Sequence, residues 1–249
     1  MSNNMYAFLL STIAGISTLI GFLFIFIKKD RENIISKALG FASGVMLTIS
    51  VIDLMPNSLI LIIKSYNLLY TIFIITMAFL IGIIISSVID KRVEKKSKNS
   101  LKLYKLGIIS MIVIMMHNIP EGIATFITTT NNIELGIILT IAIALHNIPE
   151  GISISIPIYY STNNKFKAFL YTLISGMSEP LGAIISYLFL SRFVNDTILG
   201  IIYSIIAGMM INISINELYK EAANYNKKHT FIHFIIGSVI MILNHLLFS

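Results

Sequence analysis

The chain lacks cysteine and has little charge. None of its 249 residues is a cysteine, which excludes thiolate metal ligands and disulfide bonds. Only 12% of its residues are Asp, Glu, Lys or Arg, against about 25% in an average soluble protein. The mean hydropathy is +0.85. These values do not fit a soluble domain of this length, and they favour an integral membrane protein.

Long apolar runs make up most of the sequence. A membrane-spanning helix takes about 20 mainly apolar residues, so the chain has room for about eight spans. We therefore expect an all-α integral membrane protein with one transmembrane domain, residues 1–249. The first run has no Lys or Arg before it and is too long for the apolar core of a signal peptide, so we expect it to remain as a helix. The expected helices cover residues 5–27, 34–55, 67–89, 106–128, 133–158, 166–190, 198–220 and 230–248.

Positive charge is scarce in every second loop. The loops expected after helices two, four and six contain only Lys64 and Arg192, whereas the loop at 90–105 is rich in lysine. By the positive-inside rule the Lys-rich loops are cytoplasmic, so both termini lie outside a cell membrane that the chain crosses many times. Topology and contact with the lipid bilayer account for the formal charge of +6, and we expect no nucleic-acid partner.

One six-residue sequence, HNIPEG, occurs twice, at 117–122 and at 146–151. Each copy lies near the middle of an apolar helix, where a carboxylate costs about 2.5–3.5 kcal/mol. Positions i and i+4 share a helix face, and position i+1 lies beside them. Each copy therefore presents one polar flank of His, Asn and Glu that needs a compensating cation. The six residues are His117, Asn118, Glu121, His146, Asn147 and Glu150.

The polar flanks are expected to face each other. Helices four and five are antiparallel neighbours joined by a short outer loop, so the two motifs meet at one depth. Helix six carries Glu179 directly before Pro180, which is another carboxylate in mid-span. No basic residue lies near that depth to neutralise it, which favours a metal ligand over an ion pair. The alternative for the motifs is two kinked helices with internally hydrogen-bonded polar side chains.

A second repeat is fainter. The segment Gly44–Leu54 matches Gly208–Leu218 in register at a Gly, a Met, a Ser, an acid and a Leu. The two segments run in opposite directions through the membrane, as in the inverted repeats of secondary transporters. We therefore expect two inverted three-helix halves flanking helices four and five. The paired acids, Asp53 and Glu217, lie at the outer and inner helix ends, where they are expected to guide cations.

These motifs resemble those of the ZIP (Zrt/Irt-like) family of divalent-metal transporters. The resemblance rests on the HNIPEG pair and the segment Ser175–Glu179, and it extends over essentially the whole chain. It implies a binuclear metal site at mid-membrane between helices four, five and six. Carried over, one ion would be held by Glu121, His146 and Glu150, with His117 and Met46 as further candidates. The other would be held by Asn118, Glu121, Asn147, Glu150 and Glu179.

A ligand set of imidazole, carboxylate and amide oxygen suits Zn²⁺, Fe²⁺, Mn²⁺ or Co²⁺, whereas Mg²⁺ and Ca²⁺ sites use oxygen alone. We expect an uptake carrier with alternating access, most suited to zinc. These ions are its transported substrate, and no resident cofactor is expected. The loop at 90–105 has no histidine, unlike the corresponding loop of many family members, so it is not expected to sense metal. The oligomeric state is open, with a homodimer as one alternative.

Two rival functions follow from the same residues. An intramembrane metalloprotease can hold zinc with His and Glu on one helix face, but that chemistry uses H-E-x-x-H with a glutamate base beside the first histidine. Asn118 and Asn147 occupy that place here, so we do not expect an enzyme. A proton-coupled carrier of organic solutes is the other rival, and the lack of an aromatic pocket beside the motifs speaks against it.

Overall fold

Every regular element among the residues that a computed structural model of the chain describes is helical. The structure describes residues 2–27, 30–96, 102–188 and 195–248. Within these ranges, seven helical stretches are long and apolar enough to cross a membrane. The prediction of an all-α membrane protein is confirmed.

The first two of these stretches are consecutive in the chain and run in opposite directions. Helix α1 (Asn3–Phe22) ends in a short 3₁₀ turn, Leu23–Phe26. Helix α2 (Arg31–Ile49) continues through a π-helical segment, Ser50–Leu54, into α3 (Met55–Ile63). The helix predicted over 34–55 is therefore longer at its C-terminal end. Pro56 does not stop it, because the π-helical segment alters the backbone pairing just before the proline.

The next three helices are long and nearly unbroken. They are α4 (Leu68–Lys96), α5 (Lys102–Asn131) and α6 (Ile133–Thr162). The Lys-rich loop predicted at 90–105 is helical in most of its described part, since Lys and Glu are good helix formers in water. Residues 97–101 lie outside the described residues. An ion pair of 2.6 Å between Asp90 and Lys105 ties the end of α4 to the start of α5.

The helix predicted over 166–190 is divided near its middle. It consists of α7 (Lys165–Gly176) and α8 (Ser178–Leu188), with Met177 between them at φ −68° and ψ −10°. Pro180 lies in the first turn of α8, where a missing amide costs little. Residues 189 and 190 lie outside the described residues.

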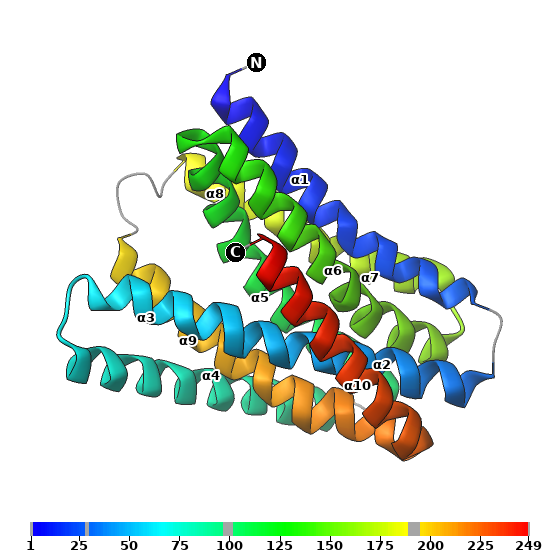
Figure 1. The fold of residues 1–249 in the computed structure, drawn as a ribbon. Helices are drawn as coiled ribbons and strands as arrows, with labels where there is room; N and C mark the ends of the chain where they lie inside the picture. Colours follow the sequence, from blue (N-terminus) through cyan, green and yellow to red (C-terminus); the bar gives the residue numbers. More distant parts are fainter. Residues whose placement is uncertain (1, 28–29, 97–101, 189–194, 249) are drawn as a thin grey trace.

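The last stretch, Asp196–Phe248, has 53 residues. It comprises α9 (Asp196–Ile213), a second π-helical segment (Ser214–Tyr219) and α10 (Lys220–Phe248). A straight helix of this length would measure about 80 Å, well beyond a hydrocarbon core of about 30 Å. Asn226 is non-helical, with φ −158° and ψ 103°, and the chain reverses direction there (Figure 1). Its Oδ1 accepts a 3.0 Å hydrogen bond from His229 N and so caps the second arm of α10.

Residues 221–229, which were predicted to form a loop, are therefore helical up to the bend at Asn226. Ala222 and Ala223 favour helix strongly, and Ala222 is also buried against the core. The helix predicted over 198–220 continues accordingly beyond residue 220.

Glycines set the closest helix contacts. Helix α1 packs along α6, α5 along α8, α2 along α10, and α4 along α9. In each pair, a Cβ added to a glycine of either helix would overlap backbone atoms of the other. Small residues allow such close approach, which stabilises helix pairs in lipid by van der Waals contact. The glycine pairs are Gly21 with Gly151, Gly122 with Gly182, Gly44 with Gly237, and Gly82 with Gly208.

The connections gather at two opposite ends of the molecule. The N-terminus, the turn after α3 and the turn between α5 and α6 lie towards one end, and the turn after α6 and the bend at Asn226 lie towards the other (Figure 1). The second end carries a large share of the basic residues, here called the Lys-rich end. They include Arg31, Lys37, Lys102, Lys165, Lys167, Lys227 and Lys228.

Candidate metal site

Helix α5 presents His117 and Glu121 on one buried face. The two residues are one helical turn apart, and α5 stays helical through Pro120. His117 Nε2 lies 3.1 Å from Glu121 Oε1. The i, i+4 spacing of the motif thus brings an imidazole and a carboxylate together inside the molecule, as the sequence predicted.

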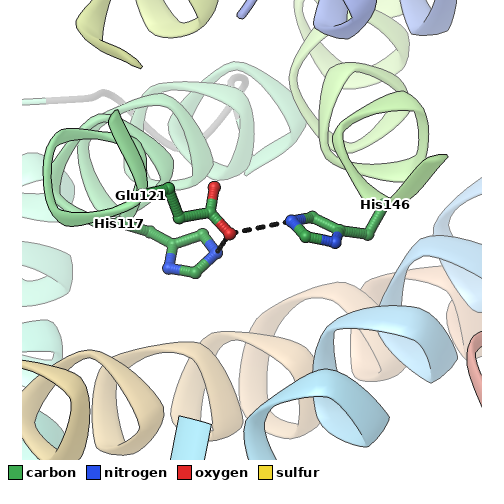
Figure 2. A group of neighbouring side chains, drawn as sticks. All are labelled: His117, Glu121 and His146. Carbon is green, nitrogen blue, oxygen red and sulfur yellow. Dashed lines mark hydrogen bonds and ion pairs between the residues drawn. The ribbon is translucent and has the colours of Figure 1, made fainter. Parts of the chain in front are cut away.

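Helix α6 adds His146 to this pair. Its Nε2 lies 2.8 Å from the same oxygen, Glu121 Oε1, so the Glu121 carboxylate lies between two imidazole rings (Figure 2). One donor atom each from His117, Glu121 and His146 lies within 4.8 Å of the others, and all three residues are buried. We call these three residues, together with Glu150, the histidine cluster.

Glu150 joins the cluster from α6. Its Oε1 lies 3.6 Å from His117 Nε2, and the residue is 1% exposed. Neither of its carboxylate oxygens accepts a hydrogen bond from the residues that the structure describes. A buried carboxylate in this condition is costly unless a cation compensates it.

Asn147 and Glu179 form a second polar group beside the cluster. Asn147 Nδ2 donates to Glu179 Oε2 and to the Ala14 carbonyl, both at 2.9 Å. The interruption at Met177 places the fully buried Glu179 in the first turn of α8, where the helix dipole favours negative charge. Glu121 and Glu150 lie close enough to interact electrostatically with this carboxylate.

Asn118 belongs to the same side of the site. Its Nδ2 donates a 3.2 Å hydrogen bond to the Ser175 carbonyl on α7. Both motif asparagines thus use their amide nitrogens on neighbouring groups. The carbonyl oxygens of both are buried, and among the described residues no donor reaches them. Amide oxygens in this position are suitable ligands for a divalent cation.

A cavity of about 460 Å³ leads to the histidine cluster from the end of the molecule that holds the termini. Glu121 and His146 line its inner part, and Asp53 lines it from the first π-helical segment. Asp53 Oδ1 accepts a 3.0 Å hydrogen bond from Asn57 and lies 3.9 Å from His245 Nδ1. Asp53 therefore lies on the approach to the cluster.

Several polar residues of this cavity are not part of the sequence prediction. They are Asn57, Tyr203, Asn244 and His245. The available signal was weak: His245 is an ionisable residue within the last apolar run, and such residues in membrane spans are functional candidates. Only the fold shows that the C-terminal end of α10 lies beside Asp53.

The inner side of the cluster is filled by apolar side chains. Ile109 and Val113 of α5, Ile154 of α6, and Met209 and Met210 of α9 are all buried there in one hydrophobic core. Ile109, Val113 and Ile154 lie nearer the Lys-rich end than the HNIPEG motifs of their own helices. The described geometry is thus hollow towards the termini and packed towards the Lys-rich end.

Met46 and Glu217 lie away from the cavity lining. Met46 is fully buried in the hydrophobic core, and its assignment as a ligand stays a prediction. Glu217 lies in the second π-helical segment, where Asp90 and Lys105 interact with it electrostatically. Because Asp90 pairs with Lys105, Glu217 belongs to an acidic and basic group near the Lys-rich end.

The donor set fits a divalent transition-metal ion. The two groups supply imidazole nitrogen, carboxylate oxygen and amide oxygen, and several of the acceptors are buried without a hydrogen-bond partner in the described part of the chain. Zn²⁺ and its first-row neighbours use such mixtures, whereas Ca²⁺ and Mg²⁺ take oxygen alone.

Comparison with known proteins agrees with this chemistry. Residues 91–245, more than half of the chain, match the model of a family described as ZIP Zinc transporter. The chain belongs to this family. The resemblance noted in the sequence is thereby confirmed, and the protein is a multi-pass membrane transporter and not an enzyme. The metalloprotease alternative is excluded.

Several ZIP proteins match this chain over its whole length. The zinc transporter ZupT of Streptococcus mutans serotype c is 39% identical over 263 residues, covering 100% of both chains. ZupT of Clostridium perfringens is 39% identical over 278 residues, covering 100% of this chain and 98% of its own. ZupT of Oceanobacillus iheyensis is 39% identical over 268 residues, with 100% of both chains covered.

Proposed function

We propose that this ZIP protein carries Zn²⁺ into the cell across the cell membrane by alternating access. The observation that carries the proposal is a buried set of unpaired metal ligands at the inner end of a cavity. The relatives named as zinc transporters support zinc as the main substrate. Fe²⁺, Mn²⁺ and Co²⁺ suit the same ligands and are proposed as weaker substrates.

The proposed site holds two ions. The first is bound by the histidine cluster, with Met46 as a further candidate. The second is bound by the carbonyl oxygens of Asn118 and Asn147 and by Glu179, and it shares Glu121 and Glu150 with the first. The hydrogen bond between Glu179 and Asn147, which lies beside His146 in the α6 motif, supports the sharing.

The proposed route starts at Asp53 and His245, passes the two-ion site and leaves near Glu217. The apolar core on the inner side lies across this route, so passage requires helices to move relative to one another. Absence of thiolate ligands keeps binding weak enough for release, as a carrier needs.

We further propose eight crossings arranged as two inverted three-helix halves around α5 and α6. The bend at Asn226 supports two crossings within the stretch Asp196–Phe248. The glycine pairs support the symmetry. In the proposed arrangement α1 corresponds to α8, α6 to α5, α2 to α9 and α10 to α4. The α1–α6 contact then has its counterpart in the α8–α5 contact, and the α2–α10 contact has its counterpart in the α9–α4 contact. Both π-helical segments fall within the faint repeat.

The orientation is testable with single cysteines, because the chain has none of its own. The lysine distribution predicts that the Lys-rich end is cytoplasmic. We expect Asn131→Cys to react with a membrane-impermeant thiol reagent in intact cells, and Lys102→Cys to react only after permeabilisation. Both side chains are exposed, so accessibility across the membrane decides the result. The reverse pattern would contradict inward transport and the outer position of Asp53.

Metal uptake into proteoliposomes tests the transport function itself. We expect Zn²⁺ to accumulate inside vesicles that contain the purified protein, and Fe²⁺, Mn²⁺ and Co²⁺ to compete, with Mg²⁺ and Ca²⁺ having little effect. Accumulation equal to that of protein-free vesicles would contradict the proposal. Uptake of an organic solute without metal would favour the proton-coupled carrier instead.

A further inference from the structure

An elongated crevice beside the metal cavity runs along the lipid-facing side of α10, and the two share His146 and Asn244 in their linings. Its inner part is a cavity of about 300 Å³ between the end of α1, the first turns of α2, and the second arm of α10. Most of its lining is apolar and includes Phe24, Ile27 and Phe41. Its polar lining residues are Asn33, Lys37 and His233, all near the Lys-rich end.

A second cavity of about 390 Å³ continues from the first, with Phe24 and Phe41 in common. It passes Ile148 of α6 and Ile240 of α10 and ends near Leu247. Its lining is almost wholly apolar, and His146 and Asn244 are the exceptions. The second arm of α10 lies between α6 and α2 (Figure 1), and it packs against both. The crevice therefore has a polar inner end and a long apolar remainder.

The polar end carries the Lys37 ammonium group, and Asp30 accepts a 3.2 Å hydrogen bond from the lining residue Asn33. No carboxylate lines the inner cavity, and among the described residues no carboxylate pairs with Lys37. His233 Nδ1 lies 2.8 Å from the His229 carbonyl oxygen. A carbonyl can only accept, so Nδ1 carries the hydrogen, and Nε2 donates to an anion when the ring carries a second proton. Lys37 is half-buried, which suits a lysine whose stem follows apolar surface and whose ammonium reaches a headgroup.

We propose that the crevice binds one anionic phospholipid of the cytoplasmic leaflet, with its phosphate at Lys37 and His233 and an acyl chain along Phe24 and Phe41. The charge of the polar end selects a headgroup with net negative charge over a zwitterionic one. The apolar length of the crevice selects a lipid over a soluble phosphate, which would leave that surface uncovered. The depth agrees, since the polar end lies where the helices leave the membrane on the Lys-rich side.

The bound chain lies between helices of different packing pairs. Helix α6 lies on one side; it packs against α1 and carries His146 and Glu150 of the histidine cluster. Helices α2 and α10 lie on the other side and pack against each other. The lipid thus fills a seam between two helix groups, one of which holds His146. Lipid binding itself does not rest on the proposed transport function.

Native mass spectrometry of the purified, metal-free protein tests this site. The protein is given equal amounts of phosphatidylglycerol and phosphatidylcholine with identical acyl chains, and retained lipids are counted. We expect the wild type to retain phosphatidylglycerol preferentially. We expect the double variant Lys37→Gln, His233→Gln to lose that preference, with roughly fivefold of the loss due to the Lys37 charge. Added glycerol phosphate should not displace the retained lipid.

Two further variants separate the crevice from general surface charge. Lys227→Gln removes an exposed lysine at the same end that does not line the crevice, and it should keep the preference. Ala38→Phe fills the inner cavity without changing charge and should reduce retention of both lipids. Equal retention of the two lipids by the wild type would overturn the proposal. The proposal would also be overturned if the double variant kept its preference for phosphatidylglycerol, or if Lys227→Gln lost that preference equally. Displacement of the retained lipid by glycerol phosphate, or full lipid retention by Ala38→Phe, would overturn it as well.

Discussion

Replacing Glu150 with glutamine is expected to abolish zinc uptake and to remove nearly all zinc binding, although the side chain keeps its shape. The carboxylate is 1% exposed, and no described residue donates a hydrogen bond to it, so its charge is available to an ion. If two ions share it, both lose that charge. Removing one partner of a buried charge pair costs about 3–5 kcal/mol, which corresponds to more than about a hundredfold in affinity.

Asn118→Ala is the informative comparison. It removes one neutral oxygen ligand of the second ion and a 3.2 Å hydrogen bond to the Ser175 carbonyl, and the hydrogen bond alone accounts for about 1 kcal/mol. Under the two-ion proposal it weakens only the second ion, so some transport survives. Calorimetry should count two zinc ions in the wild type and about one in Asn118→Ala.

A matched control for Glu150→Gln is Glu134→Gln, which makes the same chemical change at an exposed position in the first turn of the same helix. Its uptake and stoichiometry should equal those of the wild type. Equal losses in Glu150→Gln and Asn118→Ala, or one ion in the wild type, would refute the shared carboxylate. A one-ion carrier using Glu121, His146 and Glu150 would then be the better account.

The sequence was sufficient to predict the histidine cluster for two physical reasons. Helical periodicity places His117 and Glu121 on one face whatever surrounds them. A short turn between two helices of similar length makes them antiparallel neighbours, so His146 reaches the depth of Glu121. The observed 2.8 Å contact between these two residues follows from spacing and loop length alone. The hydrogen bond between Asn147 and Glu179 also requires α8 to pack beside α6, and helical periodicity does not specify that packing.

Other features depend on contacts that a pattern of apolar residues does not encode. The π-helical segments at Ser50–Leu54 and Ser214–Tyr219 insert an extra residue into a helix without changing its composition. The bend at Asn226 replaces a predicted loop by one non-helical residue, because the flanking residues still favour helix. His245 reaches Asp53 only through the packing of α10 along α2.

Gly122→Ala is expected to destabilise the protein and to remove the second ion before the first. The added Cβ would overlap the backbone carbonyl of Glu179, so α8 must move away from α5. Such overpacking costs typically about 1–3 kcal/mol. The same movement displaces Glu179 from Asn147, which now lies 2.9 Å away, while His117 and Glu121 remain one turn apart on the same helix.

Gly107→Ala is the matched control on the same helix. Its Cβ would lie 2.7 Å from Cγ1 and Cδ1 of the buried Ile158, which are side-chain atoms and not backbone, and alanine gains about 1 kcal/mol in helix propensity over glycine. Thermal unfolding in detergent should therefore show a larger fall in Tm for Gly122→Ala than for Gly107→Ala, and zinc calorimetry should show about one ion in the first and two in the second. Because Gly122 itself contributes no ligand, a lost ion would show that the contact between α5 and α8 holds Glu179 in place. If Gly122→Ala instead keeps the wild-type Tm and binds two ions, α8 can shift without displacing the Glu179 carboxylate. The second ion site would then not depend on the contact between α5 and α8.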